Sequence, residues 1–400
     1  MSKFVFTEPG AGKLEIEVSD PFTICEAPPG EYRIHPKPFI LNDGRLIMTV
    51  NRDPDIYDAE YCVLASGDRG ITWMPENRWP GGDGSGRHLA TAHALLPDGT
   101  SLVVYPHMFA TETPGSSIMP TWRSGDSGKT WSAMEAATVE TPYSESIDIY
   151  DPPEWYREAH TEEWRKRFIK PEPPRLCAPL FSSFGRKKLL SYLTNFHSLD
   201  DGTLLAFIYL ITVPFQPYIT ICIESRDAGR TWTTRSTPGP FRPEYEETNR
   251  RKKPVDGLCE PAATHLPGGK LITVMRMGGW QPLYAAWSDD GARTWTSPRK
   301  IPIFGILPTI LTLPGGILAL ASGRPDNTLS FSLDGGESWP WTLRLRDQTN
   351  PYHPSTRNNG MVQIDPGRLL YLADTGYRRP DKGVDVDHRV EGFFVNVATS

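Results

Sequence analysis

The stretch SGDRGITW occupies residues 66–73 and returns in four variants along the chain: SGDSGKTW (124–131), SRDAGRTW (225–232), SDDGARTW (288–295) and SLDGGESW (332–339). In each copy, the Ser and Asp side chains can bond nearby backbone N–H groups and fix a turn. Gly supplies a backbone conformation that other residues resist, and Trp is a large apolar plug. The fourth copy has Ala292 where the others have Gly. Five copies at irregular spacing indicate a repeated supersecondary unit.

A second repeat accompanies the first, and it consists of a turn, a Gly and an apolar run. Apolar runs of this length, bounded by Gly and Pro, are typical of strands, and a preceding strand makes each unit a hairpin. Five of the six hairpins are followed by one of the Asp-containing turns. The hairpin glycines are Gly44, Gly99, Gly202, Gly269, Gly316 and Gly367.

Six hairpins with outer strands predict an all-β fold, a six-bladed β-propeller of four-stranded antiparallel blades. A closed ring of blades leaves no exposed sheet edges. We expect a single domain over residues 1–400, in which the N-terminal stretch 4–18 completes the last blade.

The longest interval between hairpins separates the second from the third and holds DPPEWYREAHTEEWRKRF (151–168). Its opening Asp, Pro and Glu residues are typical of a helix start. We expect a short helical insertion on the rim, within residues 144–176 or so. A packed decoration is the preferred interpretation, because most insertions only lengthen a loop. A lid or a homo-oligomer contact is the alternative.

Composition limits the class of protein. Among 400 residues, 39 Pro, 35 Gly and 11% aromatics suit a β protein with many tight turns. A net charge of −6 argues against a nucleic-acid partner, and the lack of a long apolar run argues against a membrane partner. The N-terminus lacks the apolar core of a signal peptide. The scattered cysteines predict reduced thiols in a cytoplasmic protein with no metal and no cofactor: Cys25, Cys62, Cys177, Cys222 and Cys259.

Candidate site residues come from the strand ends, which meet at one mouth of a propeller. Converging Arg side chains suit a carboxylate or sulfate, because a guanidinium group can bond it through two N–H groups. The first strands of the hairpins offer Arg33, His35, His88, Glu260, Asn358 and Asn359, and the second strands lead into Arg52, Arg276 and Arg324.

The Asp-containing turns, the hairpins and YRIHP (32–36) together resemble the sialidase (neuraminidase) superfamily over nearly the whole chain. This resemblance implies a six-bladed propeller and an exo-acting glycoside hydrolase for a terminal acidic sugar. The carboxylate-binding Arg triad would then be Arg33, Arg276 and Arg324. Glu260 would polarise the nucleophile, and the acid/base Asp would lie in NRDPDIYDAEY (51–61), where spacing favours Asp58.

Two departures from the family pattern concern the chemistry. The family nucleophile is a Tyr on the first strand of the last blade, and alignment on Gly367 puts Asn358 at that position. An amide is not a nucleophile of this kind, so Tyr352 is the nearest candidate in the preceding loop. The second departure is His35, which stands between Ile34 and Pro36 and puts an imidazole beside a triad Arg.

Each of these residues also has a structural interpretation. Arg276 and Arg324 could form surface salt bridges, Asp58 could make a turn, and His88 fits a core as well as a site. The Trp residues of the repeated turns are expected to stabilise and not to catalyse.

Three functions therefore stay open. The first is a hydrolase for a sialic-acid-like sugar or a uronic acid. The second is a polysaccharide lyase on a uronic acid, in which Arg neutralises the carboxylate and His or Tyr removes the α-proton. The third is a non-catalytic sugar-binding propeller, which Asn358 supports and Glu260 opposes.

Overall fold

The computed structural model describes residues 1–8, 12–28, 31–52, 61–82, 88–90, 92–141, 146–148, 154, 184, 187–189, 191–211, 218–240, 257–277, 281–324, 326–346, 358–375 and 388–399. Nearly all regular structure in these ranges is β-strand. The 3₁₀ turns η2 (Pro267–Gly269) and η3 (Pro314–Gly316) connect the two strands of two hairpins. Within the same ranges, no helix has the length and apolarity that a membrane span requires. The predicted helix at 151–168 lies outside the described residues, apart from Glu154.

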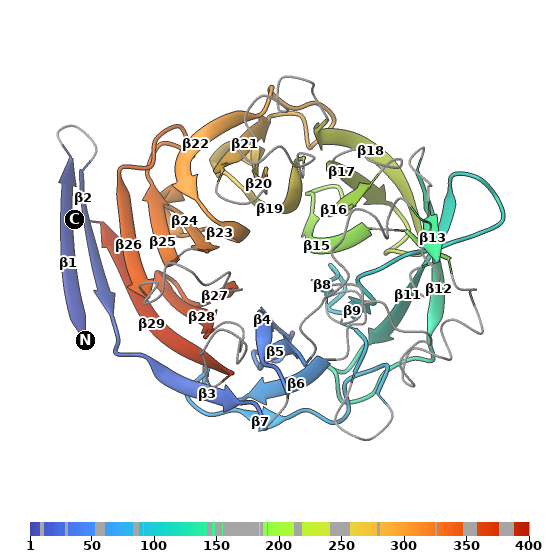
Figure 1. Ribbon diagram of the computed structural model, residues 1–400, viewed down its shortest axis with the longest axis horizontal. Helices are drawn as coiled ribbons and strands as arrows, with labels where there is room; N and C mark the ends of the chain where they lie inside the picture. The colour runs from blue at the N-terminus through green and yellow to red at the C-terminus, as the bar shows by residue number, and fades with distance from the viewer. Residues whose placement is uncertain are drawn as a thin grey trace.

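The sheets stand around a common centre, with β4, β8, β15, β19, β23 and β27 nearest to it (Figure 1). Three of the sheets have four antiparallel strands, as predicted. The first holds β4 (Ile34–Ile40), β5 (Leu46–Asn51), β6 (Tyr61–Ser66) and β7 (Met74–Pro75). The second holds β19 (Cys259–His265), β20 (Leu271–Arg276), β21 (Pro282–Ser288) and β22 (Arg299–Phe304). The third holds β23 (Ile306–Thr312), β24 (Leu318–Gly323), β25 (Asn327–Ser332) and β26 (Trp341–Arg346).

An 11-stranded sheet departs from the predicted four-stranded antiparallel pattern. It arises because β12 and β18 pair in parallel, with Thr138 opposite Thr231, and so join two neighbouring groups of strands. One group is β8 (Ala92–Leu95), β9 (Ser101–Val104), β10 (Phe109–Ala110), β11 (Ser116–Ser124), β12 (Glu135–Glu140), β13 (Ser146–Asp148) and β14 (Lys187–Leu189). The other is β15 (Ser191–Ser198), β16 (Leu204–Ile211), β17 (Tyr218–Ser225) and β18 (Thr231–Gly239).

The chain ends meet in a six-stranded sheet. Its strands are β1 (Ser2–Glu8), β2 (Gly12–Val18), β3 (Phe22–Glu26), β27 (Asn359–Asp365), β28 (Arg368–Asp374) and β29 (Arg389–Thr399). β2 and β3 both pair with β29 in antiparallel fashion. The prediction that N-terminal residues complete the last sheet is therefore confirmed, and they do so as outer strands (Figure 1).

The repeated Asp-containing turns share one set of hydrogen bonds. In the first, the Ser66 hydroxyl oxygen accepts the Gly70 N–H at 2.8 Å, and an Asp68 oxygen accepts the Thr72 N–H at 2.9 Å. The equivalent bonds recur in the other four turns. Ala292 takes the place of Gly with a left-handed φ of 65°. The Trp side chains of these turns differ in burial: Trp232 and Trp339 are buried, whereas Trp73, Trp131 and Trp295 are half-buried.

The apolar core lies between neighbouring sheets. One cluster joins Leu102 and Val104 of β9 to Leu204 and Ile208 of β16, and Trp232 belongs to it. At the centre, Phe39 of β4 stacks on His93 of β8, with ring centroids 4.5 Å apart. Burial of apolar surface between sheets holds each inner strand against its neighbours and so fixes the central cavity.

Candidate functional site

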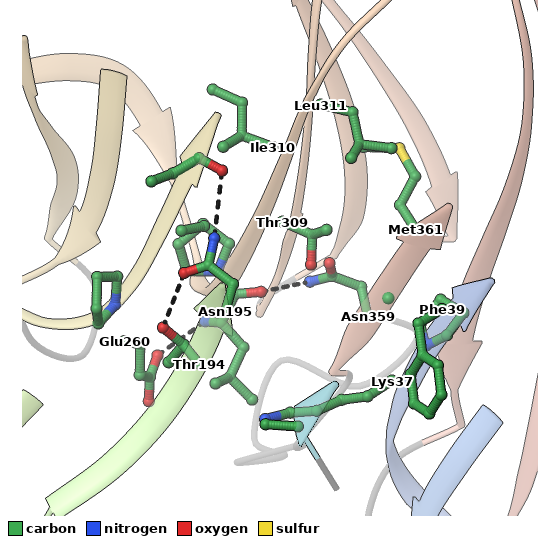
Figure 2. A pocket seen from close by; sticks show the side chains of 18 of the residues that line it. Lys37, Phe39, Thr194, Asn195, Glu260, Thr309, Ile310, Leu311, Asn359 and Met361 are labelled. Atoms are coloured by element: carbon green, nitrogen blue, oxygen red, sulfur yellow. Dashed lines mark hydrogen bonds between the residues drawn. The ribbon is translucent and has the colours of Figure 1, made fainter. Parts of the chain in front are cut away.

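A cavity of about 280 Å³ lies at the centre of the ring and is lined by all of the innermost strands (Figure 2). Its polar lining includes His35 and Lys37 of β4, Glu260 of β19 and Asn359 of β27. Its apolar lining includes Phe39, Phe196, Ile310, Leu311 and Met361. A volume near the lower end of ligand pockets, about 300 Å³, suits one sugar unit.

Three inner strands carry the same β-bulge at their start. The register jumps between Ile34 and Lys37 in β4, between Cys259 and Ala262 in β19, and between Ile306 and Thr309 in β23. An extra residue re-aims side chains, and bulges of this kind recur next to active sites.

The extra residue of each bulge is strained. His35, Glu260 and Leu307 have φ values of 55°, 49° and 43°, although none of them is glycine. Each precedes a proline, which restricts its backbone further. A left-handed residue other than glycine costs roughly 1–2 kcal/mol, and such strain gathers at functional sites. The bulges therefore mark the cavity end that holds His35 and Glu260.

Two hydrogen bonds hold the Glu260 carboxylate at the cavity. Arg276 Nη1 donates to Glu260 Oε1 at 2.7 Å, and the Leu307 N–H donates to Glu260 Oε2 at 2.8 Å. Glu260 is 9% exposed, so most of its charge is stabilised by these partners instead of water. Glu260 thus forms an ion pair with Arg276 at this mouth.

His35 and Asn358 are joined through Asp374. The backbone N–H of His35 donates to Asp374 Oδ2 at 3.1 Å, and Asn358 Nδ2 donates to the same oxygen at 2.9 Å. Asp374 is fully buried and Asn358 is 1% exposed. Asp374 of β28 thus links the bulge of β4 to Asn358, the residue that the sequence resemblance aligns with the family nucleophile.

The His35 imidazole is uncharged at neutral pH. Burial lowers its pKa from 6.5 to about 3, and the charges of Lys37 and Arg324 act in the same direction. A general base works best with a pKa near the operating pH. His35 is therefore a weak general base, although it lines the same cavity as Glu260.

Arg33 and Arg52 form a separate pair around Glu31. Arg33 Nη1 donates to Glu31 Oε2 at 3.0 Å and to the Tyr32 carbonyl at 2.7 Å, while Arg52 Nη2 donates to Glu31 Oε1. Burial acts to raise the pKa of Glu31, but the hydrogen bonds from both Arg residues hold it below its usual value. Neither Arg is part of the cavity lining.

Arg324 directly follows β24 and has a φ of 49°. It lies one step beyond the position of Arg276, because Arg276 pairs with Cys259 whereas Gly323 pairs with Ile306. The charge of Arg324 helps to lower the pKa of His35. The convergence of Arg33, Arg276 and Arg324 on one ligand stays a prediction.

His88 has a structural environment. Its Nδ1 lies 2.7 Å from the Trp79 carbonyl oxygen, its backbone pairs with Tyr61, and it is 1% exposed. The geometry favours the core alternative for this residue. Asp58 and Tyr352, the predicted acid and the substitute nucleophile, lie outside the described residues.

Sequence reasoning missed Lys37 and Asn195 in the cavity lining, whereas Asn359 was among the candidates from the first strand of the last hairpin. Lys37 follows the bulge at His35, which breaks the two-residue alternation of β4, so counting along the strand does not place it. Asn195 carries no sequence signal of its own. In the part of the chain that the structure describes, no group of three or more His, Cys, Asp or Glu side chains could hold a metal ion.

Comparisons with known proteins agree with this architecture. The BNR repeat-like domain family matches residues 171–369. A comparison with curated proteins finds no match. A protein of unknown function from Dyadobacter fermentans is similar in structure, with a TM-score of 0.63 at 15% identity over 96% of this chain and 99% of that one.

Two enzymes are also similar in structure. The Hadza microbial sialidase Hz136 has a TM-score of 0.57 at 19% identity, over 92% of this chain and 66% of that one. The α-L-arabinofuranosidase of Fusarium graminearum has a TM-score of 0.59 at 14% identity, over 95% of this chain and 98% of that one. The chain therefore contains a BNR repeat-like domain and shares its fold with sialidases, as the resemblance in sequence predicts.

Proposed function

We propose that this protein is an exo-acting glycoside hydrolase that removes a terminal acidic sugar, sialic-acid-like or a uronic acid, from a glycan. The observation that carries the proposal is the Arg276–Glu260 ion pair at a cavity of one-sugar size, on a strained bulge. A carboxylate held by an Arg can assist a nucleophile or a water, while cationic groups nearby attract an acid.

The fold alone does not select the substrate. The similar structures include sialidases and an arabinofuranosidase, and arabinose is an uncharged sugar. Lys37, Arg276 and Arg324 place positive charge around Glu260 and His35, and this favours an acidic sugar. In this proposal Glu260 assists the chemistry, Arg276 and Arg324 hold the carboxylate, and Asp58 supplies the proton.

The same proposal takes the ring as a single domain of six blades. Each innermost strand begins one blade and contributes to the cavity lining. The 11-stranded sheet then contains two blades that are joined by the parallel contact of β12 with β18.

A non-catalytic sugar-binding propeller is the second candidate. Asn358 stands at the place of the family nucleophile, and its amide is already bonded to buried Asp374. The lyase has less support, because a His35 imidazole with a pKa of about 3 is a poor base for removing an α-proton.

A cytoplasmic location belongs to the proposal as well. It rests on the cysteines, because all four described cysteines are free thiols. Burial raises the pKa of Cys25 and of Cys222 to about 12, which keeps both thiols protonated and unreactive.

Three fluorogenic glycosides test the proposal: those of N-acetylneuraminic acid, D-glucuronic acid and L-arabinofuranose. The hydrolase predicts release of the fluorophore from one of the acidic pair and little from the arabinofuranoside. A product with near-ultraviolet absorbance from a polyuronide would establish the lyase instead. Binding of acidic sugars with no turnover would establish the sugar-binding propeller.

A further inference from the structure

Lys37 lines the central cavity, and its ammonium group has no hydrogen-bond partner among the described residues. Its Nζ is buried, and no described residue accepts a bond from it. It stands 4.1 Å from the centroid of the Tyr192 ring, a cation–π contact. Figure 2 shows the Lys37 side chain extending from β4 toward the side of the pocket that holds Thr194. Because a buried charge without a hydrogen-bonding partner is costly, this position is best explained by an anionic ligand.

Asn359 adds an acceptor to the same cavity. Its Nδ2 donates to the Leu307 carbonyl at 3.2 Å, and this bond fixes which way the amide faces. Its Oδ1 is buried and has no partner among the described residues. An oriented acceptor of this kind matches a hydroxyl donor on the ligand.

The neighbouring polar groups are already occupied. Glu260 bonds Arg276 and the Leu307 N–H. The Asn195 amide nitrogen contacts His197 Nε2 and donates to the Ala263 carbonyl. Among the described lining residues, the buried polar atoms that lack a hydrogen-bond partner are thus Lys37 Nζ and Asn359 Oδ1.

We propose that Lys37 and Asn359 form a subsite for the acidic sugar itself, in which Lys37 Nζ adds a charge-assisted bond to the carboxylate that Arg276 and Arg324 hold, and Asn359 Oδ1 accepts a sugar hydroxyl. This inference rests on the proposed function and adds a recognition site inside the cavity. The apolar lining by Phe39 and Met361 suits the C–H face of a sugar ring. The ligand is a free sugar acid or the terminal residue of a glycan, since both present the same groups.

Calorimetric titration with D-glucuronate, N-acetylneuraminate and uncharged D-glucose tests the subsite. Lys37→Met keeps the length of the side chain and removes its charge, and Lys270→Met is the matched control in an exposed turn. We expect Lys37→Met to weaken binding of at least one acid by about ten- to a hundredfold, as loss of a charge-assisted bond requires. The control should bind as the unmodified protein does.

Asn359→Ala tests the hydroxyl contact separately. Loss of one uncharged hydrogen bond should weaken the same acid by about two- to tenfold. Thermal unfolding of each variant shows whether it is folded, because Asn359 also contacts Leu307. An Asn359→Ala protein that is folded and binds the acid normally would remove Asn359 from the subsite.

The outcomes separate the subsite from the hydrolase. If Lys37→Met binds and hydrolyses acidic sugars normally, the subsite is wrong and the hydrolase stands. If the unmodified protein binds neither the free acids nor their glycosides up to about 10 mM, the subsite is wrong whatever the activity. Acid binding that depends on Lys37, without hydrolysis of any glycoside, supports the subsite and overturns the hydrolase. Binding of the free acids identifies a product site, and binding of glycosides alone identifies a terminal residue.

Discussion

His35 and Glu260 occupy the same place in two different sheets, as the extra residue of the bulges in β4 and β19. Both have left-handed φ values, and both line the central cavity. The charges of Lys37 and Arg324 act on His35, and Glu260 is bonded to Arg276. A single backbone device, repeated around the ring, thus delivers an imidazole and a carboxylate to the same cavity.

Gly360→Ala should disturb the bulge of β4. A Cβ at Gly360 would lie 2.3 Å from the Pro36 carbonyl oxygen and 2.6 Å from Pro38 Cδ. Backbone cannot move aside cheaply, so we expect a loss of about 1–3 kcal/mol in the free energy of unfolding, with reduced activity. Urea unfolding measures the loss. Gly67→Ala is the control, because a Cβ there meets nothing within 4 Å, and equal stability of both variants would contradict this packing.

Asn358→Ala should destabilise the fold. The substitution removes the amide that donates a hydrogen bond of 2.9 Å to Asp374, a fully buried carboxylate. We expect a cost of about 1–3 kcal/mol in the free energy of unfolding. Asn358→Tyr should cost at least as much and should not raise activity, because the site is buried. An active, stable Asn358→Tyr protein would instead show that this position can hold the nucleophile.

Acid should weaken the fold through buried histidines. Burial lowers the pKa values of His35, His93 and His197 from 6.5 to about 3. Below pH 6.5 the unfolded chain binds these protons and the folded one does not, so stability falls with pH until about pH 3. Each histidine contributes at most roughly 1.4 kcal/mol per pH unit.

Urea titrations at several pH values between 7 and 4 measure this slope. His93→Phe keeps the stack on Phe39 and removes one titrating group, so the slope should become shallower. An unchanged slope in that variant would show that His93 does not contribute.

Local rules were enough to predict the repeated turns and hairpins. Gly44 and Gly367, for example, have φ values of 83° and 72°, as turn glycines require. The bulges could not be predicted, because the extra residue of a bulge is defined by its pairing with another strand. The parallel contact of Thr138 with Thr231 also depends on how two sheets meet, which no local pattern encodes.

The candidate site was predicted in part. Glu260 and Arg276 come from the two strands of one hairpin, so counting from Gly269 brings them together. Arg33 is different, because Glu31 competes for its guanidinium group at 3.0 Å. A prediction from strand positions does not include such a neighbouring counter-charge.

Arg276→Ala should weaken binding of an acidic sugar by about ten- to a hundredfold, and that of an uncharged sugar much less. It should also destabilise the protein, since Glu260 would lose its 2.7 Å partner in a mostly buried setting. Arg276→Lys should restore part of both, because an ammonium lacks the planar fork. Calorimetric titration and urea unfolding measure the two effects. Equal losses for acidic and uncharged sugars would contradict a role in acid recognition.

The most direct test of the account is Glu260→Gln, assayed for both turnover and binding on the acidic glycoside that the unmodified protein hydrolyses. The amide keeps the size of the side chain and removes the charge that Arg276 and the Leu307 N–H stabilise. We predict that kcat falls at least a hundredfold, in the range of a lost general base, while Kd changes less than about threefold. A Glu260→Gln protein with normal kcat, or with binding lost in proportion to kcat, would contradict a chemical role for Glu260.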